Sequence, residues 1–515
     1  MKHRTRAIHA GLVSALVLSS LGCSANVLRP GACRTDQDCE AFAPGSTCQT
    51  NGYCRVAMAT NPVDGVSNAM VRTVGIGDLS GSLQDLGGGM RDGVRAAFAA
   101  YNTANPRSRQ FVHEARDDLY VPANAAMIVD EVTRDQGAGQ GRFAFAILGS
   151  MGSPTSLAML PTINMRQVPF FGTYSGSEHL RESPPNRVVW NTRASYRNEA
   201  RFLTTHMLRR DPDPIAPGNI FALSQSPVGS MTEGVADASP AAAQPMQTVL
   251  DAYGNSGYLG IVDELAAGVG GRANIPLATY RATGTNTAIA EAYFFQWIAG
   301  LAPRVAAPAI VGGSLRVAIT MVAVASAATP FVRGVIDGMN QLRMGQKPNQ
   351  LTAAEWGNVT AERQTALRSA QLVFGSISPV GDQLATNLRS AGAATYCTTQ
   401  YPILVSQVVP FPTGSSQAAV TFRQQLAAYD QNLRPGFVNF EGWIAGQVWI
   451  AAVNATRGPL TVDSLLTTLA DPAFTVDIGT GRPVRFTEGS HDGVNDVYGS
   501  LLGAGCQYVD FTFAR

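Results

Sequence analysis

A loop of small residues near position 150 has the composition of an anion-binding turn. The apolar run at residues 143–148 leads into GSMGSPTS at residues 149–156, after which apolar spacing resumes. This pattern predicts a buried strand, a tight turn and a helix with Pro154 in its first turn. Turns of this kind bind anions, because N–H groups and the positive end of the helix dipole point outward. A tight turn with a serine cap is the alternative interpretation.

The chemistry of this loop favours a carboxylate as its ligand. The loop carries hydroxyl groups and no lysine, so it matches neither the phosphate loop GxxxxGK(S/T) nor the dinucleotide fingerprint GxGxxG. Two further polar turns follow apolar runs, at residues 78–82 and 173–177. If these runs are parallel strands, all three turns lie at carboxyl ends of strands, where ligands of α/β proteins bind.

Patterns typical of enzymes are weak in this chain. Residues 172–176, GTYSG, place the serine fourth, whereas a nucleophile elbow requires it in third place. His179, four residues after Ser175, is better interpreted as a solvated helix residue. The cysteines that follow Cys23 are even in number, so no unpaired catalytic thiol is expected. We therefore predict no catalytic residue, no metal site and no cofactor, and we expect that the protein is not an enzyme.

The N-terminus predicts export. Basic residues precede an uncharged apolar run at residues 10–21 that is too short for a mature membrane-spanning helix. Residues 1–22 are therefore predicted to be a signal peptide. The sequence SLGC, ending at Cys23, resembles a bacterial lipobox. It implies that Cys23 carries a lipid that anchors the chain to a bacterial membrane facing the periplasm, with residues 23–30 as a linker. Secretion without a lipid is the alternative.

Four cysteines lie within residues 31–56, a segment too short to bury a hydrophobic core. Their spacing, C-x5-C-x8-C-x5-C, lacks the close pairs of zinc sites, so disulfides are favoured over zinc. We expect a small disulfide-rich module of undetermined pairing, followed by a linker at residues 57–69. Two distant cysteines are expected to bridge surface elements of the large region. The disulfide candidates are Cys33, Cys39, Cys48, Cys54, Cys397 and Cys506.

The overall composition argues against nucleic-acid binding. The 38 Lys and Arg residues balance 37 Asp and Glu residues, which leaves a formal net charge of +1 and no basic footprint. No stretch after the signal peptide has the length and apolarity of a transmembrane helix. Residues 70–515 exceed what one hydrophobic core normally organises, so two lobes are expected.

From residue 70 onward, apolar runs alternate with helical spacing. Strands are expected at residues 71–79, 109–118 and 143–148, separated by helices at residues 87–104 and 122–135. This alternation predicts an α/β protein with parallel sheets and helices on both faces.

Two later segments carry predictions of their own. Residues 351–364 are interpreted as a surface insertion or loop. Residues 438–458 form a long helical pattern in which Phe440, Trp443 and Trp449 are expected to be core residues.

Five segments in series resemble the type 1 periplasmic binding proteins, in particular their branched-chain amino-acid-binding branch. GDLSGSLQDLGGGMRDGVRAAFAAYN resembles the family's first strand, loop and helix, and GSMGSPTSLAMLPTINMRQVPFFGTYSGSEHLR its two ligand loops. VVWNTRASYRNEARFL resembles the crossover between lobes. Two later segments resemble the family's late strand and return helix: LVFGSISPVGDQLATNLRSAG and FVNFEGWIAGQVWIAAVNATRGPLTVDSLLTTL. The resemblance implies two Rossmann-like lobes joined by a hinge. The first would comprise about 70–195 and 370–440, and the second about 196–369 and the C-terminal part.

The resemblance also implies a ligand site between the lobes. In the family, the first lobe holds an amino acid's carboxylate and an acidic residue of the second lobe pairs with its ammonium. Here Ser378 stands at the acidic position, and a buried ammonium without a partner costs several kcal/mol. A carboxylate or amide with an apolar body is therefore expected in place of a standard α-amino acid. The implied ligand-binding residues are Met151, Gly152, Ser153, Tyr174, Ser175, Leu86, Ala325 and Ser378.

The function that the resemblance implies is capture of a small molecule by hinge closure. The chain would be a cell-envelope lipoprotein and the substrate-binding component of an ABC importer. A ligand sensor, or an envelope scaffold with a degenerate clamp, is the alternative. The expected partners are the small molecule and an ABC permease or other envelope protein, with membrane contact through the lipid anchor only and no nucleic acid.

Overall fold

The computed structural model describes residues 64–512, apart from residues 138, 211–212, 226–255, 281–286 and 304, together with residues 34–35, 37, 47–48 and 54–55. The chain divides into two units, Met1–Thr60 and Asn61–Arg515.

In the first unit, β1 (Thr47–Cys48) and β2 (Cys54–Arg55) pair in antiparallel fashion and place Cys48 opposite Cys54. Cys48 is disulfide-bonded, which agrees with the expected disulfide-rich module. The predicted signal peptide, the predicted lipidation site Cys23, and Cys33 and Cys39 lie outside the described residues.

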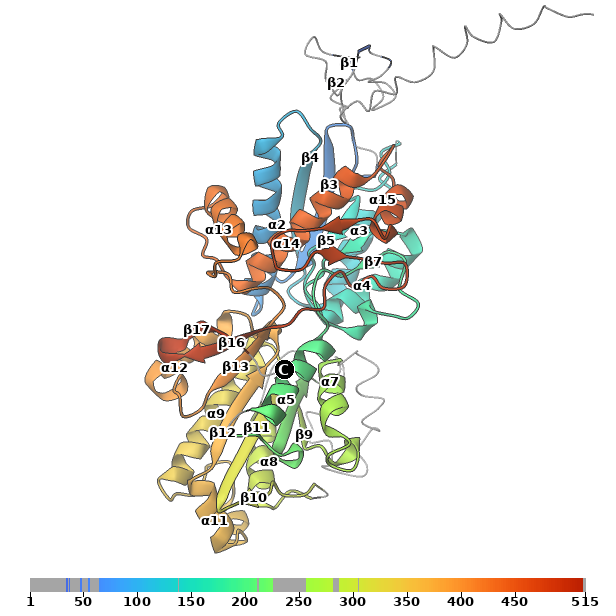
Figure 1. Ribbon diagram of the computed structural model, residues 1–515. Helices are drawn as coiled ribbons and strands as arrows, with labels where there is room; N and C mark the ends of the chain where they lie inside the picture. Colours follow the sequence, from blue (N-terminus) through green and yellow to red (C-terminus); the bar gives the residue numbers. More distant parts are fainter. Residues whose placement is uncertain are drawn as a thin grey trace, which may run out of the picture. The chain divides into compact units, whose positions relative to one another are not determined.

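The second unit contains two sheets, and the first is a parallel sheet in the order β4-β3-β5-β6-β7 (Figure 1). We call this sheet and its covering helices the first lobe. Every predicted strand and helix of this region is present, with ends shifted by a few residues. The strands are β3 (Met70–Gly77), β4 (Gln110–Asp117), β5 (Ala146–Leu148), β6 (Phe170–Phe171) and β7 (Val189–Trp190), and the connecting helices are α2 (Gln84–Ala104), α3 (Pro122–Thr133) and α4 (Ser153–Arg166).

The second lobe is built on a mixed sheet in the order β17-β16-β13-β12-β11-β8-β9, with β10 beside β11. Its middle strands are parallel, whereas β10, β16 and β17 are antiparallel to their neighbours. The expectation of parallel sheets therefore holds for the first lobe and only in part for the second, because a hairpin from the C-terminus completes one edge. The strands are β8 (Ile220–Gln225), β9 (Leu277–Tyr280), β10 (Ile310–Val311), β11 (Ser314–Val322), β12 (Gln371–Ser376), β13 (Ile403–Gln407), β16 (Tyr498–Gly503) and β17 (Gln507–Phe511).

Helices cover both faces of the second sheet. Residues of α5 (Tyr196–Arg209) and α7 (Ser256–Leu265) share a buried apolar cluster on one face. The other face is covered by α8 (Ala288–Ala299), α9 (Ala325–Arg343) and α12 (Gln383–Tyr396). This arrangement is the doubly wound architecture that the alternating sequence pattern predicts.

The described part of the chain crosses between the two lobes three times: between β7 and α5, between β13 and α13, and between β15 and β16. After the second crossing, α13 (Gln417–Tyr429), α14 (Phe437–Ala455), α15 (Val462–Ala470), β14 (Thr475–Val476) and β15 (Val484–Arg485) pack with the first lobe. Three connecting segments therefore join the lobes where the resemblance implies a hinge.

The predicted division of residues 370–440 was wrong. We expected this region in the first lobe, but β12, α12 and β13 belong to the second, because β12 pairs with β11 and β13 pairs with β12. The chain returns to the first lobe only at α13. The C-terminal part is also divided, since α14 covers the first sheet while β16 and β17 complete the second.

Residues 351–364 are helical rather than a loop. They contain α10 (Ala353–Gly357) and the start of α11 (Ala361–Arg368). Thr352 caps the first helix in a reciprocal capping box with Glu355, and Thr360 caps the second. These caps satisfy backbone N–H groups that a helix start leaves unpaired, which lets such short helices form.

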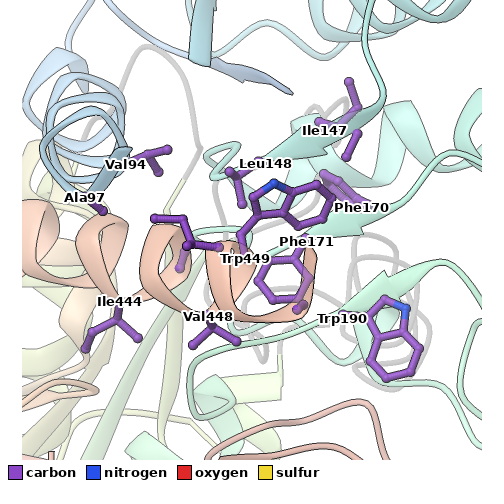
Figure 2. Packing of buried hydrophobic residues seen from close by; sticks show 14 of the residues in the cluster. Val94, Ala97, Ile147, Leu148, Phe170, Phe171, Trp190, Ile444, Val448 and Trp449 are labelled. Atoms are coloured by element: carbon purple, nitrogen blue, oxygen red, sulfur yellow. The ribbon is translucent and has the colours of Figure 1, made fainter. Parts of the chain in front are cut away.

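The long helix α14 forms the centre of the first lobe's core (Figure 2). Trp449 lies against Phe171 of β6, with ring centroids 5.4 Å apart. The core positions predicted for Phe440, Trp443 and Trp449 are confirmed, since all three are buried. The helix approaches α2 closely at Gly93, where a Cβ would lie 2.0 Å from the Asn439 carbonyl oxygen. Glycine at this position therefore sets the spacing of the two helices.

One predicted disulfide joins two elements of the second lobe. Cys397 follows the last turn of α12, and Cys506 ends the short helix that precedes β17; the two are bonded. The bridge confirms the pairing expected for these two residues and ties the C-terminal hairpin to α12. None of the helices that the structure describes has the length and apolarity needed to cross a bilayer.

Candidate functional site

A pocket lies between the lobes at the carboxyl ends of their strands, as the position of the polar turns predicts. It encloses about 740 Å³ of space not filled by protein atoms, including its mouth toward solvent. The first lobe contributes Leu83, Leu86, Tyr120, Met151, Gly152, Ser153, Pro154, Leu157 and Tyr174, and the second contributes Tyr196, Gln225, Tyr280, Val322, Ala323, Val324, Ile377 and Pro379.

The predicted anion-binding loop at residues 149–156 contributes residues 151–154 to this pocket. Its backbone is fixed to the neighbouring turn, because Tyr174 N–H donates to the Ser150 carbonyl at 2.7 Å and Gly152 N–H donates to the Tyr174 carbonyl at 3.2 Å. Gly152 has φ +102°, and a Cβ there would lie 2.6 Å from the Tyr120 ring. Only glycine fits, so the loop brings backbone directly to the pocket wall.

Two serines of these turns form a hydroxyl pair. Ser153 Oγ and Ser175 Oγ lie 2.8 Å apart, and Ser175 Oγ also accepts Ser177 N–H at 3.3 Å. Ser175 is fully buried, so its proton needs an acceptor, and Ser153 Oγ is the one at hand. Ser153 lines the pocket at the first turn of α4. Its own proton is then available to a ligand acceptor.

Tyr120 is held in the pocket by an unusual backbone. Leu119 and Tyr120 both have positive φ, +54° and +59°. The carboxylate of Asp118 stabilises this turn, because its Oδ1 accepts Tyr120 N–H at 2.8 Å. The Tyr120 phenol in turn interacts with Gln225, which ends β8 of the second lobe. Side chains of the two lobes thus meet across the pocket.

The second lobe also presents phenol groups. The Tyr280 hydroxyl donates to Gln225 Oε1 or the Val322 carbonyl, each at 3.3 Å, and accepts Val324 N–H at 3.3 Å. Burial raises the pKa values of Tyr120, Tyr174 and Tyr280 above that of a solvated tyrosine. These phenols therefore remain protonated at neutral pH and can donate hydrogen bonds.

The predicted site residues divide into two groups. Leu86, Met151, Gly152, Ser153 and Tyr174 line the pocket. Ser175, Ala325 and Ser378 are not among its lining residues. Ser175 supports Ser153 from behind, and Ala325 begins α9 immediately after the lining residues that end β11.

Ser378 is an internal connector rather than a ligand group. Its hydroxyl accepts a hydrogen bond from Arg193 at 2.6 Å and donates to Glu199 at 3.0 Å. Its carbonyl accepts the Tyr174 hydroxyl at 3.2 Å. The residue expected to face the ligand instead fixes the neighbouring lining residues Ile377 and Pro379.

Sequence reasoning missed the polar residues of the second lobe and one of the first. Tyr196, Gln225 and Tyr280 stand at the start of α5 and at the ends of β8 and β9, and Tyr120 follows β4. Their signal is a polar or aromatic residue directly after an apolar strand run, the same signal that marked the first-lobe turns.

The described residues show no catalytic arrangement around Ser175. Its Oγ is bonded to Ser153 and Ser177, and the buried Nε2 of His179 has no hydrogen-bond partner. In the part of the chain that the structure describes, no group of three or more His, Cys, Asp or Glu side chains is placed to hold a metal ion. The arrangement is that of a binding pocket whose hydrogen-bonding groups are uncharged.

Comparisons with known proteins agree with this arrangement. Residues 71–244 match the sequence model of the periplasmic binding protein family. Comparison with curated proteins gave no match. The fold resembles a possible leucine/isoleucine/valine-binding protein from Rhodopirellula baltica SH 1, with 22% identity and a TM-score of 0.63, covering 87% of this chain and 98% of that one.

Two further solved structures have the same fold. A substrate-binding periplasmic protein from Ralstonia solanacearum is 18% identical, with a TM-score of 0.59 and coverage of 85% of this chain and 99% of that chain. A solute binding protein of an ABC transporter from R. palustris, in complex with benzoate, is 14% identical, with a TM-score of 0.55 and coverage of 86% and 98%. The sequence match over residues 71–244 and the two-lobed fold together support the type 1 periplasmic binding protein family.

Proposed function

We propose that this protein is an exported solute-binding protein that captures a small molecule with a carboxylate or amide group and an uncharged, largely apolar body. The observation that carries the proposal is the chemistry of the pocket wall. Its described lining consists of aliphatic side chains, four tyrosines, one serine and one glutamine, without a charged side chain. Such a wall offers apolar surface for the body of a ligand and a few hydrogen-bonding groups for its orientation.

This wall argues against a zwitterionic α-amino acid. A buried ammonium needs a carboxylate partner, and its desolvation costs several kcal/mol when none is present. Among the described lining residues no Asp or Glu occurs. The nearby acids Glu199 and Glu441 are bonded to Arg193 and do not line the pocket.

A ligand carboxylate or amide oxygen would bind at the first lobe. The Ser153 hydroxyl and the N-terminus of α4 lie at the pocket wall, and Gly152 leaves the first turn of that helix without a side-chain cap. The helix dipole favours negative charge at this position. The fold relative from R. palustris binds benzoate, a carboxylate with an apolar ring, which is the ligand chemistry proposed here.

Binding would act through lobe closure. A ligand held by the first lobe gains contacts with Tyr196, Gln225 and Tyr280 only when the second lobe is near, so it stabilises the closed state. In this proposal the protein delivers its ligand to an ABC permease. Lipidation at Cys23 would hold it at the membrane, which mass spectrometry of the N-terminal peptide can test. If a Cys23→Ala variant is found in the same cell fraction as the native protein, the proposed lipid anchor is contradicted.

The proposal can be tested on the full-length exported protein. If the protein is found in the membrane fraction, detergent would be used to extract it. Native mass spectrometry would identify a co-purified small molecule, and thermal-shift measurements would compare benzoate, benzamide and leucine. We expect stabilisation by benzoate or benzamide, reaching about 2.7 kcal/mol at 100 times the dissociation constant. Stabilisation by leucine alone would contradict the ligand class. No shift and no bound molecule would favour the scaffold alternative.

A further inference from the structure

Arg193 is a buried cation at the junction of the two lobes. It lies on the segment that crosses from β7 to α5 and has no exposed surface. Its Nη1 donates to Glu441 Oε1 of α14 in the first lobe at 3.1 Å. Its Nη2 donates to Glu199 Oε1 at 2.8 Å and to Ser378 Oγ at 2.6 Å, both in the second lobe. One planar guanidinium therefore bonds both lobes at once.

The same guanidinium packs against two rings of the pocket wall. Its central carbon lies 4.7 Å from the ring centroid of Tyr174 and 5.3 Å from that of Tyr196. Both tyrosines line the pocket, whereas Arg193 does not. Cation–π contacts of this kind hold a ring in place without using its hydroxyl group. The hydroxyl of Tyr174 is fixed separately by the Ser378 carbonyl.

The carboxylates around Arg193 are themselves fixed. Glu199 accepts hydrogen bonds from Ser378 N–H and from Ser406 Oγ, each at 2.8 Å. Glu441 is buried, and burial raises its pKa to about 7 even though Arg193 opposes the shift. A second buried arginine, Arg181, donates to the Arg193 carbonyl at 3.1 Å and so supports the crossing segment.

We propose that Arg193 is a positioning residue that sets the two pocket tyrosines, Tyr174 and Tyr196, and makes ligand affinity depend on the lobe junction. The inference deepens the proposed function and rests on it for its affinity measurement. Lysine cannot substitute fully, because its single ammonium group lacks the planar fork that bonds two carboxylates and a hydroxyl together. Arg193 thus acts on the ligand through the rings, without touching it.

The decisive variant keeps the buried region free of unpaired charge. Arg193→Met combined with Glu199→Gln and Glu441→Gln removes one cation and both of its carboxylate partners. Replacing all three charged groups together avoids the large cost of leaving one buried charge unpaired. Thermal unfolding should therefore remain close to that of the native protein. The single variant Arg193→Lys serves as a partial rescue. The matched control is Arg343→Lys, because Arg343 stacks on Tyr401 away from the pocket.

Two measurements on the full-length protein test the proposal. Fluorine NMR of 3-fluorotyrosine-labelled protein reports the rings of Tyr174 and Tyr196, assigned with Tyr→Phe variants. Calorimetry reports affinity for benzoate. In the triple variant we expect both ring resonances to move and affinity for benzoate to fall about tenfold or more, the scale of charge-assisted contacts. The Arg193→Lys variant should have an affinity and ring resonances between those of the triple variant and the native protein. The Arg343→Lys variant should match the native protein in both measurements.

The outcomes separate this proposal from the proposed function. Unchanged ring resonances with affinity within twofold of native would overturn the role of Arg193. If the native protein binds neither benzoate nor benzamide, the proposed ligand class is wrong, and the NMR measurement alone decides: moved rings support the positioning role and unmoved rings overturn it.

Discussion

The Tyr120 hydroxyl of the first lobe and the Gln225 side chain of the second interact across the pocket that both line. This contact joins a turn after β4 to the end of β8, and Gln225 Oε1 also lies 3.3 Å from the hydroxyl of Tyr280. A direct contact between the lobes can exist only while they are close together. It therefore contributes to the closed state in the way that a bound ligand does.

The variant Tyr120→Phe removes the hydroxyl that makes this contact and keeps the ring. We expect ligand affinity to fall about two- to tenfold, since a neutral hydrogen bond contributes about 0.5–1.5 kcal/mol. Calorimetry would measure the affinity, and small-angle X-ray scattering would measure the compaction on binding. Tyr101→Phe is the control, because that hydroxyl bonds Asn454 within the first lobe. Equal affinities in the two variants would show that the contact across the pocket does not contribute to closure.

The two serines of the first lobe should differ when each is replaced by alanine. Ser153→Ala removes the hydroxyl that faces the ligand, and we expect about tenfold weaker binding with little change in thermal stability. Ser175→Ala removes only the support behind it, so a smaller loss of affinity is expected. Calorimetry with the ligand found in the screen would compare them. Native affinity in the double variant would show that the ligand binds elsewhere.

Asp118 should make stability depend on pH. Burial raises the pKa of its carboxyl to about 7, helped by the neighbouring Asp78 and Asp117, and its Oδ2 has no hydrogen-bond partner. The unfolded chain has a pKa of about 3.9. The folded state therefore binds the proton more tightly, and this stabilisation is complete below about pH 4 and is lost as pH rises through 7.

The variant Asp118→Asn keeps an acceptor for Tyr120 N–H and cannot ionise. We expect it to be more stable than the native protein at pH 8 and to reduce the fall in unfolding free energy between pH 4 and 8. One proton accounts for at most about 1.4 kcal/mol per pH unit. Urea unfolding at several pH values would measure this. Other carboxyls whose pKa values are raised in the same direction, among them Glu441 and Asp382, contribute to the slope that remains. If the unfolding free energy of the variant falls with pH as steeply as that of the native protein, the role of Asp118 is contradicted.

The disulfide between Cys397 and Cys506 closes a loop of 109 residues. Replacing both cysteines by serine should lower the free energy of unfolding by about 2–5 kcal/mol, because the unfolded chain regains conformational freedom. Chemical unfolding would measure the loss, which would exceed that of an isolated surface substitution. A reductant should lower the stability of the native protein further than that of the variant. If it affects both equally, disulfides outside this pair, such as the one at Cys48, dominate.

The sequence by itself determined the elements of the first lobe and the loop that lines the pocket there. Apolar runs there are short and end in small polar turns, so strand, turn and helix follow from local patterns. The loop that holds Met151, Gly152 and Ser153 was recognised in this way, because the geometry that forms it is contained within one turn. Trp443 and Trp449 were recognised as core residues for a similar reason, since helical spacing assigns them to one apolar face.

Only the tertiary structure decided which sheet each late strand joins and what faces the pocket from the second lobe. β12 and β13 carry no local sign of their sheet, because pairing with β11 depends on contacts distant in sequence. Ser378 was expected at the ligand, yet its hydroxyl is bonded to Arg193 and Glu199, far from it in the chain. Local patterns determine an element, whereas the partners of a buried polar group are determined by the packing of the whole molecule.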